Sequence, residues 1–444
     1  MIKIEKIQLN NFRFFIDEEE NNTFKPNAKG LLVYGENGSG KSSLFKAFEL
    51  LATATISAEE FAKNINIFSN DNTYLEFDFS NDEPSLRIDS DELSLNNHEP
   101  FVKTLSVSKP MIEYKQLLKV SYSENNNQNL YPFFEKILEN YPIDNEADDI
   151  NILKDLDGEI FFNKFKEIIL WDILEDINYY LNAFNQNIKI TDVVFDGFNK
   201  TTFLDINFFD ENITTYHHFL NEARLSALTI SVYFAIIKKQ FDKLGENSLK
   251  ILVLDDLLIS LDMNNRLSLI DILKTEFSDF QIFFFSHEKA LYDLINEKMS
   301  LKAYEVYVNK KDNYEVPFIK QSNTLLDQAI YQKDTQNYGC SANILRQYTE
   351  KLLCQFLPKE QILDRRCKVS NLDTLLTKAK KFEETKTTNR NQDIVDILIK
   401  LKTFKRVLLN DASHYNSTEI YKNELENVID TLISFADTIS DEEN

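Results

Sequence analysis

Residues 35–42 constrain the fold of this chain more than any other segment. They read Gly-Glu-Asn-Gly-Ser-Gly-Lys-Ser, which matches GxxxxGK[ST], with apolar residues at 31–34 before them and helical apolar spacing at 42–52 after them. Glycines let successive backbone N–H groups face a phosphate, and the N-terminus of the next helix adds a positive dipole. The chain has only 8 glycines, and three lie here. The pattern predicts a strand, a phosphate-binding loop and a helix.

The residue types in this segment each suit phosphate binding. We expect Lys41 to reach the β- and γ-phosphates, and the hydroxyl of Ser42 to take one position around Mg²⁺. ATP and Mg²⁺ are therefore the expected cofactors. A chance glycine turn is the alternative, which the flanking patterns disfavour. The residues predicted to contact the nucleotide here are Gly35, Asn37, Gly38, Ser39, Gly40, Lys41, Ser42 and Ser43.

A second motif supplies the acids that such a loop needs. Residues 251–254 are apolar and are followed by Asp255 and Asp256. We expect Asp255 to bind Mg²⁺ through water and Asp256 to polarise the attacking water. A solvated acidic turn is the alternative. Asp262 follows shortly, and His287 comes directly after the next apolar strand pattern at 281–285.

This order of motifs resembles the ABC-type ATPase heads of the SMC, RecF and RecN class. The resemblance covers about residues 1–105 and 195–310, and Phe12-Arg13 is similar to the "nFR" pattern that ends the first strand of those heads. It implies that Asp256 is the catalytic carboxylate and that His287 senses the γ-phosphate. It also implies that Arg13 and the D-loop acid Asp262 contact nucleotide.

The same class has a signature loop, which each subunit donates to the ATP of its partner. Residues 219–227 stand in the corresponding place but depart from LSGGQ, with Asn221 for the serine, Glu222 and Ala223 for the glycines and Arg224 for the last polar residue. Asparagine can cap a helix and can also donate to a phosphate. The resemblance thus implies an ATP-bridged homodimer or higher homo-oligomer; a plain N-capped helix is the alternative.

Two further positions depart from the class or stay open. Most heads have Glu where this chain has Asp256, and a misplacement of about 1 Å can cost about 100-fold in rate. We therefore expect slow hydrolysis. For the glutamine that contacts Mg²⁺ in this class, Gln116 is the candidate, with a surface helix residue as the alternative.

Alternating strand and helix patterns predict an α/β fold. We expect an ABC-type ATPase head, with a mostly parallel sheet, flanking helices and an antiparallel lobe, together with a helical insertion and an all-α C-terminal domain. The insertion is too short for a coiled-coil arm and lacks heptads. The predicted boundaries are 1–105 for the N-lobe, 106–187 for the insertion, 188–310 for the C-lobe and 322–444 for the C-terminal domain.

The formal net charge of −23 disfavours nucleic-acid binding by the chain as a whole. Basic residues outnumber acidic ones over 364–406, which makes this segment a candidate nucleic-acid or partner surface; a solvated helix face is the alternative. No apolar run approaches the roughly 20 residues of a membrane span, and the first residues do not resemble a signal peptide. A cytoplasmic location without membrane contact is the expectation.

The short insertion, the signature-like segment and the helical domain resemble ATPase subunits of prokaryotic antiphage defence systems such as PARIS and Septu. This implies that ATP-driven closure of two heads senses infection and controls a separately encoded nuclease or toxin. A RecF-like DNA repair or recombination ATPase that binds DNA is the alternative, and the acidity of the chain argues against it.

Overall fold

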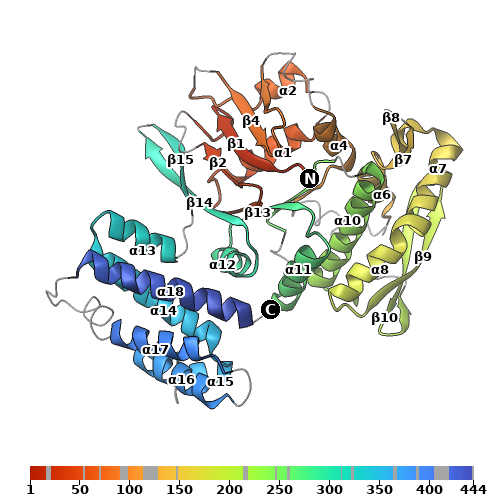
Figure 1. Cartoon of the computed structure of the whole chain (residues 1–444). Helices are drawn as coiled ribbons and strands as arrows, with labels where there is room; N and C mark the ends of the chain where they lie inside the picture. Colours follow the sequence, from red (N-terminus) through yellow and green to blue (C-terminus); the bar gives the residue numbers. More distant parts are fainter. Residues whose placement is uncertain are drawn as a thin grey trace. The chain divides into compact units, whose positions relative to one another are not determined.

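The computed structural model divides the chain into two compact units, Met1–Ser322 and Asn323–Asn444 (Figure 1). The residues that it describes are 1–16, 22–53, 56–69, 72–90, 99–113, 129–146, 149–213, 219–245, 248–257, 261–311, 313–321, 325–363, 368–386, 390–404 and 420–442.

An antiparallel sheet opens the first unit. Its strands are β1 (Ile4–Asn10), β2 (Thr23–Phe24), β4 (Tyr74–Phe79) and β5 (Leu86–Asp89), in the order β2-β1-β4-β5. Buried and partly exposed residues alternate along β4, as expected for a strand with one face on the core. The short helix α2 (Ala58–Ala62) starts at Ser57, whose side chain accepts a hydrogen bond from the backbone N–H of Glu60. This sheet is the predicted antiparallel lobe.

The central sheet is mostly parallel and lies in the core. It has the order β15-β14-β3-β13-β12-β6, and only β15 runs antiparallel to its neighbour. Strands β3, β12 and β13 are almost wholly buried, because helices cover parallel sheets on both faces. The predicted α/β fold class is confirmed. The strands are β3 (Leu31–Gly35), β6 (Met111–Glu113), β12 (Ile251–Asp255), β13 (Gln281–Ser286), β14 (Lys302–Lys311) and β15 (Tyr314–Gln321).

Four helices of this unit position the candidate site. They are α1 (Lys41–Leu51), α10 (Glu222–Leu244), α11 (Met263–Thr275) and α12 (Lys289–Lys298). The Phe48 ring of α1 packs 4.5 Å from the Phe283 ring of β13, centroid to centroid, which fixes α1 against the sheet. Helix α10 begins after its cap Asn221 and ends at Gly245, whose φ of +81° favours glycine.

The described part of the predicted helical insertion consists mainly of helices, but it also contains three short strands that the sequence analysis did not predict. Strand β6 pairs with β12 in the central sheet, and β7 (Pro142–Glu146) and β8 (Asp149–Ile152) form a hairpin. The three residues of β6 are too few to show the two-residue period of a strand. The sequence of β7 is mostly polar, so apolar and polar positions do not alternate clearly along it. The remaining elements are α4 (Pro100–Ser108), α6 (Tyr131–Leu138), α7 (Gly158–Glu167), a π-helix (Ile168–Ile173) and α8 (Leu174–Ala183).

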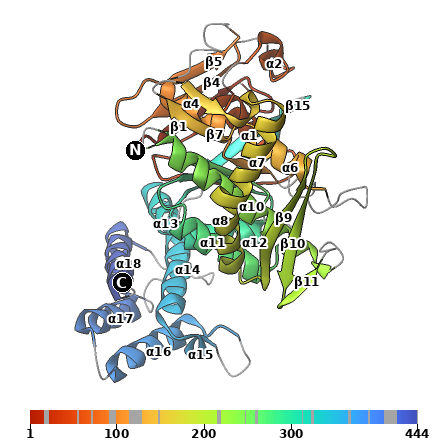
Figure 2. The same ribbon diagram turned by 90° about the vertical axis from the view of Figure 1, so that its right-hand side faces the viewer.

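A second antiparallel sheet accompanies the insertion. Its strands are β9 (Ile188–Asp196), β10 (Thr201–Phe208) and β11 (Glu211–Ile213), in the order β11-β10-β9. The side-chain amide of Asn178 in α8 exchanges two hydrogen bonds with the backbone of Ile190, at 2.8 and 2.9 Å. These bonds cap the edge of β9. Figure 2 shows α7 and α8 beside this sheet.

The second unit is helical throughout its described part. Its core is formed by leucines such as Leu345, Leu353 and Leu398, together with Phe435. None of the helices that the structure describes, in either unit, combines the length and apolar character that a membrane span requires. The helices are α13 (Leu325–Asp334), α14 (Tyr338–Phe356), α15 (Lys359–Ile362), α16 (Leu372–Thr385), α17 (Gln392–Phe404) and α18 (Lys422–Glu442).

Candidate nucleotide site

The glycine-rich loop connects β3 to α1 and depends on its glycines. Gly38 and Gly40 have φ values of +85° and +107°, in the region that favours glycine. A Cβ atom on Gly40 would also lie 2.9 Å from the ring of Phe14, and one on Gly35 would collide with the hydroxyl of Ser39. Steric fit and backbone conformation therefore both explain why glycine occupies these positions.

Lys41 places its ammonium inside the loop. The residue is 7% exposed, and its Nζ donates to the carbonyl oxygens of Gly35 at 2.5 Å and Glu36 at 3.2 Å. Burial lowers the pKa of Lys41, whereas the nearby carboxylates of Asp256 and Asp255 act in the opposite direction. The loop thus holds a positive charge beside two acids, as phosphate and Mg²⁺ binding require.

Three serines of the loop segment differ in their surroundings. Ser42 is exposed in the first turn of α1. Ser39 is buried, and its hydroxyl makes no hydrogen bond with any described residue. The Ser43 hydroxyl accepts a hydrogen bond from the backbone N–H of Phe14 at 3.4 Å, which ties α1 to the segment after β1. Asn37 is exposed at the tip of the loop.

Parallel pairing brings the acidic residues to the edge of the sheet that carries the loop. Asp255 pairs with Phe285 in register, and β13 lies between β12 and β3. Parallel strands end at the same edge, so Asp255 and the loop face the same space. Mg²⁺ takes few protein oxygens and completes its shell with phosphates and water. The exposed hydroxyl of Ser42 and the carboxylate of Asp255 fit such an ion.

Asp256 is held by the residue that follows β13. One carboxylate oxygen, Oδ1, accepts the backbone N–H of His287 at 2.9 Å and lies 2.8 Å from Nδ1 of the same histidine. The backbone N–H of Asp256 donates to Phe285, and its φ of +50° is unusual for a residue other than glycine. The structure therefore brings together the two residues that the sequence assigns to hydrolysis and γ-phosphate sensing.

Asn221, predicted to contact the ATP of a partner, and Asp262, predicted to contact nucleotide, are each the N-cap of a helix. The Oδ1 atom of Asn221 accepts the backbone N–H of Arg224 at 3.0 Å, and the side chain of Asp262 accepts that of Asn265 at 3.0 Å. Both residues are exposed, as is Glu222, while Ala223 is partly exposed. Neither of these two capping hydrogen bonds involves the glycine-rich loop.

Arg266 adds a connection that the sequence motifs do not reveal. Its Nη1 atom lies 2.7 Å from Glu288 Oε1, and its Nε donates to the carbonyl oxygen of Leu261 at 2.9 Å. The side chain is 13% exposed. It joins the segment before Asp262 to the residue after His287, so these two loops are linked. The sequence does not reveal this link, because it depends on the two loops lying close together in the folded chain.

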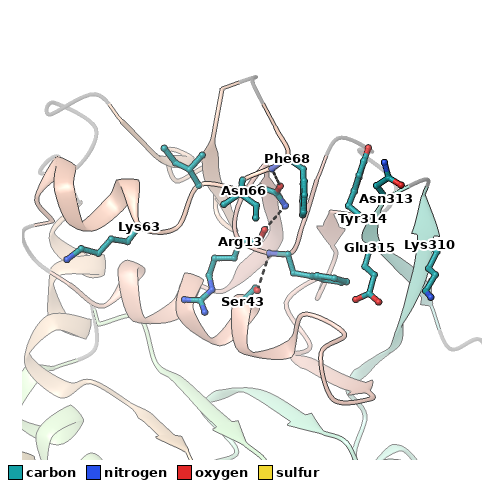
Figure 3. Close-up of a pocket in the computed structure, with 12 residues that line it drawn as sticks. Arg13, Ser43, Lys63, Asn66, Phe68, Lys310, Asn313, Tyr314 and Glu315 are labelled. Carbon is teal, nitrogen blue, oxygen red and sulfur yellow. Dashed lines mark hydrogen bonds between the residues drawn. The ribbon is translucent and has the colours of Figure 1, made fainter.

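Arg13 lies in a pocket beside the loop. It has a φ of +53°, its backbone N–H donates to Asn64, and its carbonyl oxygen accepts the side chain of Asn66. The pocket has a volume of about 860 Å³. Figure 3 shows Arg13 and Ser43 between Lys63 on one side and Tyr314, Glu315 and Lys310 on the other. Its lining residues are Arg13, Phe14, Ser43, Lys63, Ile65, Asn66, Ile67, Phe68, Lys310, Asn313, Tyr314 and Glu315.

An aromatic stack forms one wall of this pocket. The rings of Phe68 and Tyr314 lie 5.1 Å apart at an interplanar angle of 16° (Figure 3). Sequence reasoning missed both residues, because one follows α2 and the other begins β15, far apart in the chain. The exposure of Phe68, at 54%, is a property of the fold and gave no signal in the sequence. Gln116 lies outside the described residues.

One family model matches the first part of the chain. Residues 6–192 match the family model described as "AAA domain". This match includes the glycine-rich loop and ends before α10 and β12. No curated protein matches the chain. The matched segment thus contains the strand, glycine-rich loop and helix that form the candidate phosphate-binding site.

Solved SMC head domains resemble the chain at low identity. One is the SMC head bound to the C-winged helix domain of ScpA, with 12% identity, a TM-score of 0.46, and coverage of 73% of this chain and 99% of that chain. A second is the Pyrococcus furiosus SMC head with an extended coiled coil, bound to the C-terminal domain of ScpA. It has 12% identity and a TM-score of 0.45, and the match covers 76% of this chain and 100% of that chain. The SMC head domain of Thermotoga maritima has 12% identity and a TM-score of 0.41, and the match covers 72% of this chain and 99% of that chain.

Proposed function

We propose that this chain binds ATP with Mg²⁺ and hydrolyses it slowly. The observation that carries the proposal is the convergence of Lys41, Asp255 and the Asp256–His287 pair at one edge of the central sheet. Lys41 exchanges its bonds to the loop carbonyls for bonds to the β- and γ-phosphates. Ser42 and Asp255 hold Mg²⁺, which neutralises phosphate charge.

Hydrolysis requires a carboxylate that orients water against the γ-phosphate. Asp256 is the residue in position, and its Oδ1 is already engaged by His287. His287 fixes the direction of this carboxylate and responds when a γ-phosphate arrives beside it. The short side chain of Asp256 keeps the reaction slow, because small displacements of a catalytic group strongly reduce the rate.

The nucleoside occupies the pocket beside Arg13. Its volume of about 860 Å³ suits a ligand of this size, and Phe68 and Tyr314 provide aromatic surface for a base. Lys63 and Arg13 also line the pocket and give it positive charge. Ser43, the neighbour of Ser42, lines the same pocket and connects it with the phosphate site.

Two chains associate around bound ATP, and each contributes the exposed N-caps of α10 and α11 to the interface. Asn221 uses only its Oδ1 in capping α10, so its amide nitrogen can donate to a phosphate on the partner's ATP. Asp262 is exposed in the same manner at the start of α11. The closed state is a homodimer or a higher homo-oligomer.

Closure controls a separately encoded nuclease or toxin in antiphage defence. The compact insertion, which has no coiled-coil arm among its described residues, and the helical second unit support this role over chromosome tethering. The basic segment 364–406 gives weaker support to a DNA-binding role. Of its lysines, Lys378 donates to Gln361, Leu363 and Ser370, and Lys386 pairs with Glu383.

A pull-down from the native operon tests this role. The Asp256→Asn variant should bind ATP without hydrolysing it and so retain its partners. We expect a stoichiometric nuclease or toxin by mass spectrometry, lost in the Lys41→Ala variant. Recovery of DNA without a protein partner would contradict the defence role and favour the RecF-like alternative. Recovery of neither would contradict both.

A further inference from the structure

A second cavity lies in the insertion, away from the nucleotide site. It has a volume of about 670 Å³ and is lined by residues of α6, the start of α7 and the turn between β9 and β10. Figures 1 and 2 both show these elements side by side. Four carboxylates and two lysines line it, together with aromatic rings, so the cavity combines negative charge with apolar surface.

The aromatic part of the cavity is rigidly supported. Phe161 and Phe162 both stack on the buried Phe165, with centroids 5.8 and 6.4 Å apart and interplanar angles of 19° and 21°. Tyr131 packs against the same ring at 5.2 Å. The faces of such rings are negative and attract ammonium and guanidinium groups.

The cavity already attracts an ammonium of its own chain. Nζ of Lys200 lies 5.8 Å from the centre of the Tyr131 ring and 3.8 Å from a carboxylate oxygen of Glu135. Its side chain remains 68% exposed. On the same aromatic cluster, Lys166 lies 5.9 Å from the centre of the Phe162 ring. Two lysines of the chain therefore lie against these rings. Because Lys200 is mostly exposed and its ion pair with Glu135 is long, another cation could displace it.

Of the other carboxylates of the cavity, Glu139 pairs with Lys109 at 3.0 Å, whereas two have no such partner among the described residues. Asp157 and Glu159 are exposed and form no ion pair with a described residue, and the Asp157 side chain does not cap α7 although it precedes it. Ile160, which follows Glu159, is 67% exposed, and Phe198, which follows the lining residue Gly197 in the β9–β10 turn, is 97% exposed. Exposed apolar side chains beside unpaired acids are typical of an interaction surface.

We propose that this cavity is the docking site for a segment of a partner protein that inserts a lysine or arginine side chain flanked by apolar residues. The cation replaces Lys200 between Tyr131 and Glu135, while the apolar residues cover Ile160 and Phe198. Charge complementarity selects this occupant, because the carboxylates outnumber the lysines and would repel nucleic acid. The site does not depend on ATP binding.

Fluorescence anisotropy on the full chain tests the docking site. The probe is a fluorescein-labelled peptide of alternating lysine and leucine, compared with peptides of lysine and serine and of glutamate and leucine. We expect binding of the first alone, and about tenfold weaker binding to a Glu135→Gln/Glu159→Gln variant. The matched control is Asp271→Asn/Glu297→Gln, which removes two exposed acids elsewhere and should bind as the wild type does.

A second pair of variants distinguishes binding of the peptide in the cavity from electrostatic attraction of the peptide to the acidic protein as a whole. Lys200→Ala removes the internal cation and should strengthen binding, whereas Lys103→Ala, an equal charge change on α4, should not. Equal effects within either matched pair, equal binding of the lysine–serine peptide, or no binding at all would overturn the proposal. Mg–ATP binding should be unchanged in all four variants, so failure here is distinguishable from failure of the ATPase proposal.

Discussion

Oδ1 of Asp256 lies 2.8 Å from Nδ1 of His287 and also accepts the backbone N–H of that histidine at 2.9 Å. The two residues follow neighbouring parallel strands, so a shift at the end of β13 moves the carboxylate at the end of β12. A γ-phosphate that contacts His287 would therefore alter the position of Asp256. In the proposed function, this relationship would couple sensing of the nucleotide with its hydrolysis.

Replacing His287 tests this coupling. We expect His287→Ala to bind Mg–ATP with nearly unchanged affinity and to hydrolyse it about tenfold to 100-fold more slowly, since Asp256 loses a bond that orients it. Single-turnover phosphate release measures the effect. Glu297→Gln is the control, because it changes an exposed acid of α12 and leaves both the Asp256–His287 contact and the Arg266–Glu288 ion pair in place. A single-turnover rate equal to that of the wild type would rule out the coupling.

The glycines of the loop differ in what a side chain would meet. Ala at position 40 would require an unfavourable φ and contact the Phe14 ring, whereas Ala at position 38 would require only the unfavourable φ. We expect both Gly40→Ala and Gly38→Ala to weaken ATP binding, with the larger loss in Gly40→Ala. Titration calorimetry measures the affinities. Gly339→Ala, in the helical second unit, is the control, and the reverse order of losses would contradict the steric argument.

The lowered pKa of Lys41 predicts how nucleotide binding depends on pH. Burial holds this pKa below the ordinary value of 10.5, so the ammonium loses its proton at a lower pH than an exposed lysine does. Phosphate binding needs the protonated form. The affinity for ATP should therefore fall over a pH range below 10.5, in which an ordinary lysine stays largely charged.

The Lys41→Arg variant serves as the control for this dependence. Its guanidinium stays protonated throughout the range, so its affinity, although lower from the start, should not change with pH. Equilibrium dialysis with labelled ATP at constant ionic strength makes the comparison. A parallel decline in the wild type and the variant would show that another group is responsible.

The pocket beside Arg13 should recognise the base. We expect Phe68→Ala and Tyr314→Ala to weaken ATP binding by about tenfold, in the range of base–aromatic stacking, and to leave the binding of inorganic triphosphate unchanged. Competition against a fluorescent ATP analogue gives both affinities. Tyr421→Ala, an exposed tyrosine of the second unit, is the control. Equal losses for ATP and triphosphate would assign these rings to folding rather than to the base.

The sequence predicted the nucleotide loop and the fold class because these depend on local patterns. Gly40 is followed by a helix and preceded by a buried strand, and both features are visible in order along the chain. The pocket of Phe68 and Tyr314 was not predictable, since 246 positions separate the two residues. The strand Met111–Glu113 was missed because its partner, β12, rather than its own pattern, makes it a strand.

The central claim is that the edge of the sheet with Lys41, Asp255 and Asp256 is an ATPase site. Steady-state phosphate release from Mg–ATP tests it most directly. We predict a slow turnover in the wild type, below the roughly 10 s⁻¹ typical of enzymes, and none above background in Lys41→Ala and Asp256→Asn. Release at the same rate from all three proteins, or none from the wild type, would contradict the claim.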